Sequence, residues 1–538
     1  MAVIELLLLL LLSCVALGWV ARHFKFPYPI ALVAGGAALG LVPNLPPYTF
    51  DPQLILVAVL PPILYQAALL TSWTDFKANL RAIGLLAIGL VAATTLAVGV
   101  ALKVMVPDVP WSVAFVLGAI VSPPDAVAAT AILSRLNMPR RIVTILEGES
   151  LVNDASGLVL YKFGVAAVLT GAFSLAQAAG QFALVSAGGV VVGVVLAFAY
   201  ISVHRRLGDP FIEVLTVLTI PYAAYLAAEA VHTSGVLAVV AAGLVRGRYA
   251  PEIVSAEMRI MARSVWNLLV FLLNSLVFIL IGLQLPQVVN ALRNYPPGEL
   301  AAIATVVTTV AIAVRFAWVL PTAWLPHWTG RLLRKPQPRP DNAQLAIVAW
   351  CGMRGIVSLA AVLALPLTLA DGRAFPHRDL LIFLTFVVIV VTLVGQGLTL
   401  APLIRRLKVG STWSLHDEQV RIRACMSGAA LAAIDREVGE HGIPPHWADG
   451  LKKEIADRIA VVASEDEELT PRLDAVNRLR QAAIAAERGE LIRLWRANEI
   501  GDELMHHLME MLDYDQARLP HARPAGAGEP EERVAAAD

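Results

Sequence analysis

The sequence predicts an all-α polytopic membrane protein of about 13 transmembrane helices, followed by a helical domain outside the membrane. Apolar residues fill 57% of the 538 positions and the mean hydropathy is +0.68, against roughly 45–50% apolar residues in a soluble domain. Apolar runs of about 20 residues, enough to cross a hydrocarbon core of about 30 Å, recur as far as residue 402. Charged residues make up 41 of the first 402 positions but 43 of the last 136.

The charge balance divides the chain. Its formal net charge is zero, but residues 1–402 carry 24 basic and 17 acidic side chains and the remainder carries 18 and 25. We expect a transmembrane domain over 1–402, a cytoplasmic helical domain over 403–519 that is regulatory or supports a dimer, and a disordered tail over 520–538.

Several classes of function lack support in the sequence. The three cysteines are widely spaced, which argues against a disulfide framework and against a CxxC metal site. No nucleotide-binding or calcium-binding motif occurs after residue 402. We expect no cofactor, no enzymatic activity and no nucleic-acid partner.

Apolar runs define the expected spans in order. The opening run has no basic n-region and no A-x-A cleavage site, so we expect it to be a first helix rather than a cleaved signal peptide. The second and ninth spans are the shortest. The spans are residues 2–20, 29–42, 53–70, 81–102, 111–134, 142–170, 178–203, 211–231, 234–246, 264–290, 299–325, 342–369 and 379–402.

The loops between these spans predict the orientation. Loops after odd-numbered spans hold 17 Lys and Arg residues, and loops after even-numbered spans hold 4. Basic residues accumulate in cytoplasmic loops. We expect a multi-pass protein of the inner (plasma) membrane, with its N-terminus outside and its C-terminal domain in the cytoplasm.

Ionisable side chains within the spans are the main functional signal, since each costs about 2.5–3.5 kcal/mol at the bilayer centre. Two further charges, Lys162 and Glu229, have no role that we can assign, and we expect Lys162 to reach the membrane interface. The charges that we single out are four acids and two arginines, namely Asp125, Glu147, Glu149, Asp154, Arg315 and Arg354.

Two of the spans are expected to be broken in the middle. Pro123 and Pro124 remove two backbone donors from the fifth span, and Gly352 to Gly355 interrupt the twelfth. Broken helices in opposite halves of a transporter are typical of inverted repeats that cross at the membrane midplane. The plain alternative is that prolines and glycines are simply common in membrane helices.

The sixth span carries a polar stripe. Ser150 and Asp154 are four residues apart and share a helix face, with Glu147 two turns before Asp154. A hydroxyl and a carboxylate suit a hard cation such as sodium, so we expect both to be metal ligands. Glu149 lies about 140° round the helix from Asp154 and is expected to pair with a buried arginine. The alternative for Asp154 is a satisfied interhelical hydrogen bond.

The segments SPPDAVAAT, GESLVNDASGLVLY and CGMRGIVSLA, in this order and spacing, resemble the monovalent cation:proton antiporter family, and in particular its bacterial sodium/proton exchangers related to eukaryotic plasma-membrane exchangers. The resemblance implies a homodimer. Each protomer would have a dimerisation bundle and a six-helix core, in which the fifth and twelfth helices unwind and cross.

The resemblance also implies roles for single residues. Asp154 matches the carboxylate that binds the ion or the proton, and Ser150 and Asp125 match polar residues of the same site. Asn153 matches an asparagine that is associated with electroneutral one-for-one exchange.

Three more positions follow from the resemblance. Glu149 and Arg315 match a structural ion pair, and Arg354 matches the arginine beside the crossing. The segment LPPILYQAAL departs from the pattern LPPLLFE by placing Gln66 where many relatives have an acid. We therefore take Gln66 as a candidate ion ligand, with the sodium-over-potassium preference left open.

The expected function is secondary active exchange of Na⁺, and of Li⁺ as a further substrate, for H⁺ in pH homeostasis. One buried carboxylate that binds a cation or a proton, but never both, couples the two fluxes by competition. The rate should show a bell-shaped pH dependence. Potassium/proton exchange by the same mechanism is the alternative.

Two other classes fit the sequence less well. An intramembrane aspartyl protease would carry a GxGD sequence, which is absent here. A passive cation channel would place rings of carbonyls or acids around a symmetry axis, whereas these carboxylates lie within one chain beside broken helices.

Overall fold

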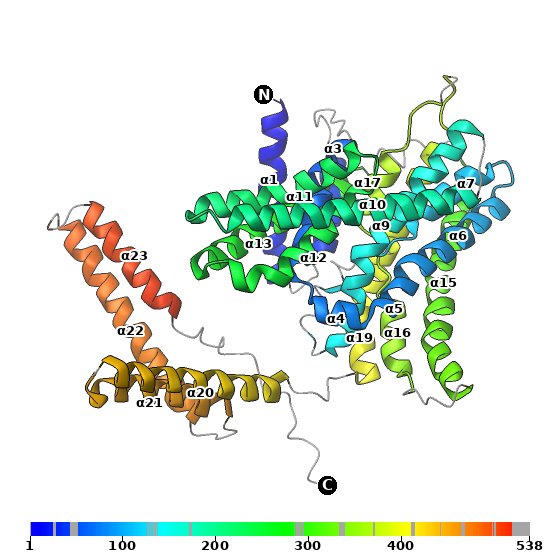
Figure 1. Cartoon of the computed structure of the whole chain (residues 1–538). Helices are drawn as coiled ribbons and strands as arrows, with labels where there is room; N and C mark the ends of the chain where they lie inside the picture. The colour runs from blue at the N-terminus through cyan, green and yellow to red at the C-terminus, as the bar shows by residue number, and fades with distance from the viewer. Residues whose placement is uncertain are drawn as a thin grey trace, which may run out of the picture. The chain divides into compact units, whose positions relative to one another are not determined.

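The computed structural model describes residues 2–24, 28–42, 52–125, 129–130, 133, 136, 138–171, 175–284, 286, 292, 295–332, 339–369, 372–409, 415–441, 443–463, 469–497, 499 and 502–518. These residues form helices and their connections, apart from one isolated bridge between Thr368 and Ala374. The predicted all-α class is therefore confirmed. The chain divides into two compact units, Met1–Ser411 and Thr412–Asp538, and Figure 1 shows the helices of both.

The first unit contains helices in each of the expected spans, as far as its residues are described. Its elements are α1 (Ala2–His23), α2 (Tyr28–Gly40), α3 (Pro52–Leu70), α4 (Trp73–Ala78), α5 (Leu80–Gly84), η1 (Leu85–Leu90), α6 (Val91–Met105), α7 (Trp111–Val121), α9 (Arg140–Thr170), α10 (Leu175–His204), α11 (Pro210–Ala230), α12 (Gly235–Ile253), α13 (Ala256–Leu283), α15 (Pro297–Leu332), α16 (Asn342–Trp350), α17 (Ile356–Leu363), α18 (Arg378–Val391), η2 (Thr392–Gln396) and α19 (Gly397–Leu407).

Seven described helices are long and apolar enough to cross a membrane, and four shorter apolar helices accompany them. The long ones include Leu80–Met105, which joins α5, η1 and α6, and Arg378–Leu407, which joins α18, η2 and α19. Parts of the expected spans 111–134 and 264–290 lie outside the described residues. The structure thus supports a multi-pass membrane protein without fixing the number of crossings at thirteen.

Side-chain caps explain where several helices begin. The Asp209 carboxylate accepts hydrogen bonds from Phe211 N and Ile212 N at 2.9 and 3.0 Å, which starts α11. Ser234 caps α12, and Asp341 caps α16. These oxygens satisfy N–H groups that have no partner within a helix.

Glycines let several helices pack backbone to backbone. A Cβ built on Gly36 of α2 would overlap the Ile279 carbonyl of α13, and one built on Gly282 of α13 would overlap the Val33 carbonyl of α2. Gly118 brings α7 equally close to Thr95 of α6. Small residues at such crossings are the usual means of helix packing in a bilayer.

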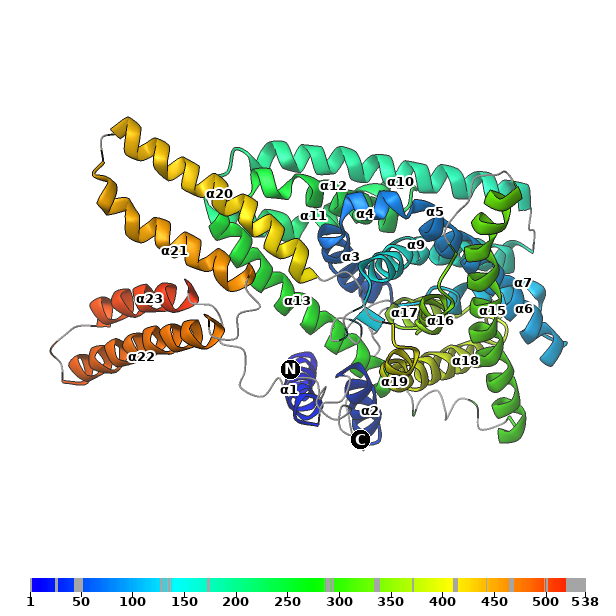
Figure 2. The same cartoon turned by 90° about the horizontal axis from the view of Figure 1, so that it is seen from below.

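Helix α9 lies between the two groups of helices that make up the first unit. One apolar core includes residues of α2, α7, α15, α16 and α18, and the other includes residues of α3, α10, α11 and α12. Helix α9 packs against α7 on one side and against α3 and α12 on the other, as Figure 2 shows from below. Residues of α9 therefore face both cores.

The second unit consists of helical hairpins. Helices α20 (Leu415–His441) and α21 (Pro445–Ala463) pack together, as do α22 (Leu469–Arg496) and α23 (Asp502–Arg518). The tail that we expect to be disordered, residues 520–538, lies outside the described residues.

Candidate ion-binding site

Two helices of the first unit unwind at the same place. Helix α7 ends at Val121, and the chain continues without helical structure through Pro123 and Pro124 to Asp125. Helix α16 ends at Trp350, and α17 begins only at Ile356. The Asp125 amide donates a hydrogen bond of 2.7 Å to the Met353 carbonyl. The two unwound segments are therefore in direct backbone contact.

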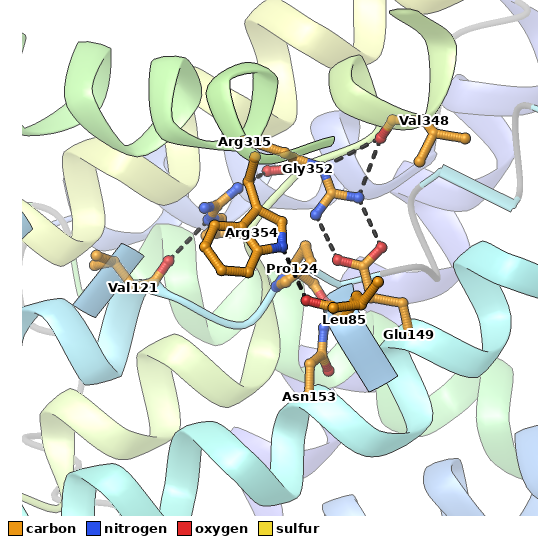
Figure 3. Close-up of polar contacts among 10 residues, drawn as sticks. Leu85, Val121, Pro124, Glu149, Asn153, Arg315, Val348, Gly352 and Arg354 are labelled. Carbon is orange, nitrogen blue, oxygen red and sulfur yellow. Dashed lines mark hydrogen bonds and ion pairs between the residues drawn. The ribbon is translucent and has the colours of Figure 1, made fainter. Parts of the chain in front are cut away.

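The Arg354 side chain holds the ends of the two broken helices together. Its Nε donates to the Val121 carbonyl at 2.8 Å, and its Nη1 donates to the Gly352 carbonyl, as Figure 3 shows. Its amide donates to Thr392 Oγ1 at 3.0 Å. Carbonyls at the C-terminal end of a helix carry partial negative charge, which stabilises the buried guanidinium there.

The Asp125 carboxylate lies at the start of α17. A Cβ built on Gly355, the residue that precedes α17, would overlap this carboxylate. Glycine at position 355 therefore makes room for Asp125. The N-terminal end of a helix favours a negative charge, which helps to compensate for burying the carboxylate.

A buried ion pair fixes α9 against α15 and α16. Arg315 Nη1 and Nη2 contact Glu149 Oε1 and Oε2 at 2.5 and 2.7 Å (Figure 3). Arg315 also donates to the Val348 carbonyl of α16 through Nε and Nη2, at 3.2 and 3.1 Å. Both partners are about 1% exposed, so this bidentate pair is a structural element that joins three helices.

Asn153 connects α9 to the proline break. Its Nδ2 donates to the Pro124 carbonyl at 2.9 Å (Figure 3), while its Oδ1 is buried without a hydrogen-bond partner among the described residues. The Pro124 carbonyl lies in the unwound segment after α7, and the asparagine amide satisfies it.

A cavity of about 180 Å³ lies beside this crossing. It is bordered by α3, the unwound segment after α7, α9 and α17, and it collects three carboxylates and three hydroxyls among apolar side chains. The polar lining residues are Asp125, Thr130, Glu147, Ser150, Asp154 and Ser358.

Asp154 is the deepest carboxylate of the α9 stripe. It is 6% exposed, it lines the cavity, and within the described part of the chain its carboxylate has neither a hydrogen-bond partner nor a cationic partner. Ser150 lies one turn earlier on the same wall. An unpaired buried carboxylate is costly, and a cation or a proton that enters the cavity relieves this cost.

Most of the site residues predicted from the sequence meet at this crossing, but Gln66 does not. Its neighbours Leu64 and Ala67 line the cavity and Gln66 itself does not. The Gln66 amide instead lies 3.5 Å from Asn267 Oδ1 of α13. Gln66 thus contributes to the packing of α3 against α13.

Two polar lining residues were not predicted from the sequence. Ser358 and Thr130 lie within CGMRGIVSLA and SPPDAVAAT, but a hydroxyl inside an apolar run gives no signal by itself. Ser358 Oγ is buried without a hydrogen-bond partner among the described residues. Lys162, which we expect to reach the interface, forms an ion pair with Glu229 of α11, with Nζ–Oε distances of 3.1 Å; nothing in the sequence indicated this pairing.

Comparisons with known proteins agree with this architecture. The family model described as "Sodium/hydrogen exchanger, transmembrane" matches residues 8–406. An uncharacterised Na⁺/H⁺ exchanger of Mycobacterium tuberculosis strain H37Rv is 34% identical over 519 residues, which cover 95% of each chain. A sodium, potassium, lithium and rubidium/H⁺ antiporter of Bacillus subtilis is 38% identical over 407 residues, covering 73% of this chain and 60% of that protein.

A solved structure shares the fold. The sodium proton antiporter MjNhaP1 from Methanocaldococcus jannaschii superposes with a TM-score of 0.60 at 17% sequence identity, covering 76% of this chain and 99% of that one. The family match and the full-length relatives settle the classification. The chain belongs to the sodium/hydrogen exchanger family, whose members are membrane-spanning transporters rather than enzymes.

Proposed function

We propose that this protein exchanges Na⁺, and also Li⁺, for H⁺ across the cell membrane by competition at Asp154. The observation that carries the proposal is a carboxylate, 6% exposed, that lies in a cavity beside two broken helices and has no partner among the described residues. Family membership supports the same activity, since relatives are named Na⁺/H⁺ exchangers and antiporters.

The proposed cation site consists of oxygen ligands around Asp154. Ser150 and Asp125 line the same cavity, and Ser358 adds a hydroxyl that the described residues leave without a hydrogen-bond partner. Gln66 is not part of this set, because its side chain does not line the cavity. A small hard cation without its water shell prefers such oxygens.

Coupling requires only that the two ions exclude each other. A proton on Asp154 removes the negative charge that holds sodium, and sodium on the carboxylate blocks protonation. The site can cross the low-dielectric barrier when a bound ion neutralises its charge. An empty, charged site cannot cross easily, because burying an uncompensated charge is energetically unfavourable. Each sodium ion that moves one way is thus balanced by protons that move the other way.

The cavity opens towards one side of the membrane. Along α3 the exposed fraction rises from 3% at Leu60 to 73% at Leu70, and both residues line the cavity. The short helices that follow Leu70 carry Lys77 and Arg81, and α9 begins with Arg140 and Arg141. The positive-inside rule supports a cytoplasmic location for this end, and we therefore propose that this is an inward-facing state of the transporter.

We infer one-for-one electroneutral exchange in a homodimer of the inner membrane, with the N-terminus outside. Asn153, bound to the Pro124 carbonyl, occupies the position that the family resemblance associates with electroneutrality. Residues 403–519 then form a cytoplasmic domain that regulates transport or supports the dimer. Residues 520–538 form a disordered tail in this proposal. Potassium/proton exchange is the second candidate, because a relative 38% identical is named for potassium as well as sodium.

The test is dye-reported proton flux in proteoliposomes that contain the full chain. Sodium or lithium added to the wild type should move protons, with an initial rate that a clamp of the membrane potential does not change. The variant Asp154→Asn should lose this flux, while Glu252→Gln, which removes an exposed carboxylate of α12 outside the cavity, should keep it. Exchange that persists in Asp154→Asn would refute the proposal, and potassium that replaces sodium at equal rate would favour the second candidate.

A further inference from the structure

One carboxylate of the cavity has no role in the mechanism described so far. Three carboxylates line the cavity, and Glu147 is the one that neither the crossing nor the proposed sodium site uses. It lies on α9 seven residues before Asp154, which places it about 10.5 Å along the helix axis. Ser150 lies between them on the same wall.

Glu147 lies towards the end of the cavity at which the lining residues are more exposed. Asp154 is buried and Glu147 is half-buried, so exposure increases along α9 from Asp154 towards Glu147. It increases in the same direction along the opposite wall, from Leu60 to Leu70. A cation that enters from the open end therefore meets Glu147 before it reaches Asp154.

The surroundings of Glu147 differ from those of Glu149, two residues further on. Glu149 is tied to Arg315 by two short contacts, whereas Glu147 has no hydrogen bond or ion pair to any described residue. A glutamate that served to hold helices together would have a partner. An unpaired carboxylate on a cavity wall instead raises the local concentration of cations.

We propose that Glu147 is a relay carboxylate, which binds the entering cation or proton transiently and passes it along the Ser150 wall to Asp154. This inference rests on the proposed cation/proton exchange and adds a second binding step to it. Glu147 contributes to capture of the ion, and Asp154 remains the site at which sodium and protons exclude each other.

The test compares Glu147→Gln with the wild type in the proteoliposome assay, with sodium varied on the side to which the cavity opens. The apparent KM for sodium should rise between about twofold and about fifteenfold, the range that Coulomb's law gives for one charge at about 10 Å and effective dielectric constants of about 80 and about 20. The maximal rate should stay near the wild-type value, because Asp154 is intact. Glu147→Asp, which keeps the charge, should restore most of the affinity.

Ionic strength provides a readout that a packing role would not change. Added choline chloride should raise the wild-type KM towards that of Glu147→Gln, because salt screens the attraction, while the KM of the variant should change little. Glu252→Gln is the matched control, since it removes one carboxylate from the same unit without touching the cavity.

Each outcome decides the inference. A wild-type protein without sodium-driven proton flux would overturn the proposed function itself. With an active wild type, an unchanged KM in Glu147→Gln, a lower maximal rate at unchanged KM, or an equal rise of KM in Glu252→Gln would overturn the relay role and leave the exchange at Asp154 standing.

Discussion

At the scale of single residues, the ion cavity depends on which polar groups are paired and which are not. Glu149, Arg315 and Arg354 are buried, and each is bonded to a partner on another segment. Asp154 lacks such a partner among the described residues and faces the cavity. The same helix α9 thus carries one acid in a buried ion pair and, five residues later, the acid that we propose to bind the ion.

Gly355 offers a test of how Asp125 is positioned. In Gly355→Ala the new Cβ would overlap the Asp125 carboxylate, so the carboxylate must move out of the cavity wall or α17 must shift. We expect exchange to fall by about tenfold or more, because displacing a functional group by about 1 Å can reduce a rate a hundredfold.

The control is Gly84→Ala, at a helical glycine whose added Cβ would meet nothing within 4 Å. Sodium-driven proton flux measured for both variants tests whether Gly355 positions Asp125. Equal, wild-type-like rates in the two would mean that close packing at Gly355 does not position Asp125.

At the scale of helices, two breaks create the site. Pro123 and Pro124 end α7 early, and the stretch between α16 and α17 leaves further carbonyls outside any helix. Arg354, Asn153 and the Asp125 amide satisfy several of these groups. Irregular backbone is tolerated at membrane depth only where it is enclosed by protein or lines a cavity, and both conditions hold here.

The Glu149–Arg315 pair should make a large contribution to the stability of this arrangement. Glu149→Leu or Arg315→Met should each lower the free energy of unfolding by about 3–5 kcal/mol, because each leaves an uncompensated buried charge. The double variant should lose less free energy of unfolding than the two single variants lose together, since neither buried charge remains.

Unfolding of the purified protein by a denaturing detergent, followed by circular dichroism, would measure all four proteins of this double-mutant cycle. Losses that simply add would show that the two side chains do not interact, contrary to the contact distances of 2.5 and 2.7 Å.

At the scale of the whole molecule, every described residue that lines the cavity belongs to the first compact unit. The second unit contributes amphipathic helices with exposed apolar side chains, for example Met426, Leu479 and Met511. Its composition is acidic and its helices are far more polar than those of the first unit. The proposed transport site therefore lies in the first unit, and any regulatory role that we propose belongs to the second.

A chain that ends after Ser411 tests this division. It should keep the wild-type KM for sodium, because the cavity is intact. Both proteins should show a bell-shaped pH dependence, since protons displace sodium from Asp154 at low pH and become too scarce to complete the cycle at high pH. The centre of the profile or the oligomeric state should differ between them.

Flux across a range of pH and the mass of the detergent-solubilised particle provide the two measurements. If truncation changes neither, the second unit neither regulates transport nor supports the dimer. If the truncated protein remains folded but no longer shows saturable sodium-driven proton flux, the assignment of transport to the first unit is wrong.

The sequence by itself determined the class of the protein, the segments able to cross a membrane, the two helix breaks and the polar stripe on α9. These properties depend on local chemistry: the transfer free energy of apolar side chains, the missing N–H of proline and the 3.6-residue period of a helix. The tertiary structure decided that Gln66 lies outside the cavity, that Ser358 and Glu147 line it, and that Lys162 meets Glu229. Such contacts join residues far apart in the chain, and they are fixed by the direction and depth at which whole helices pack, which no single segment specifies.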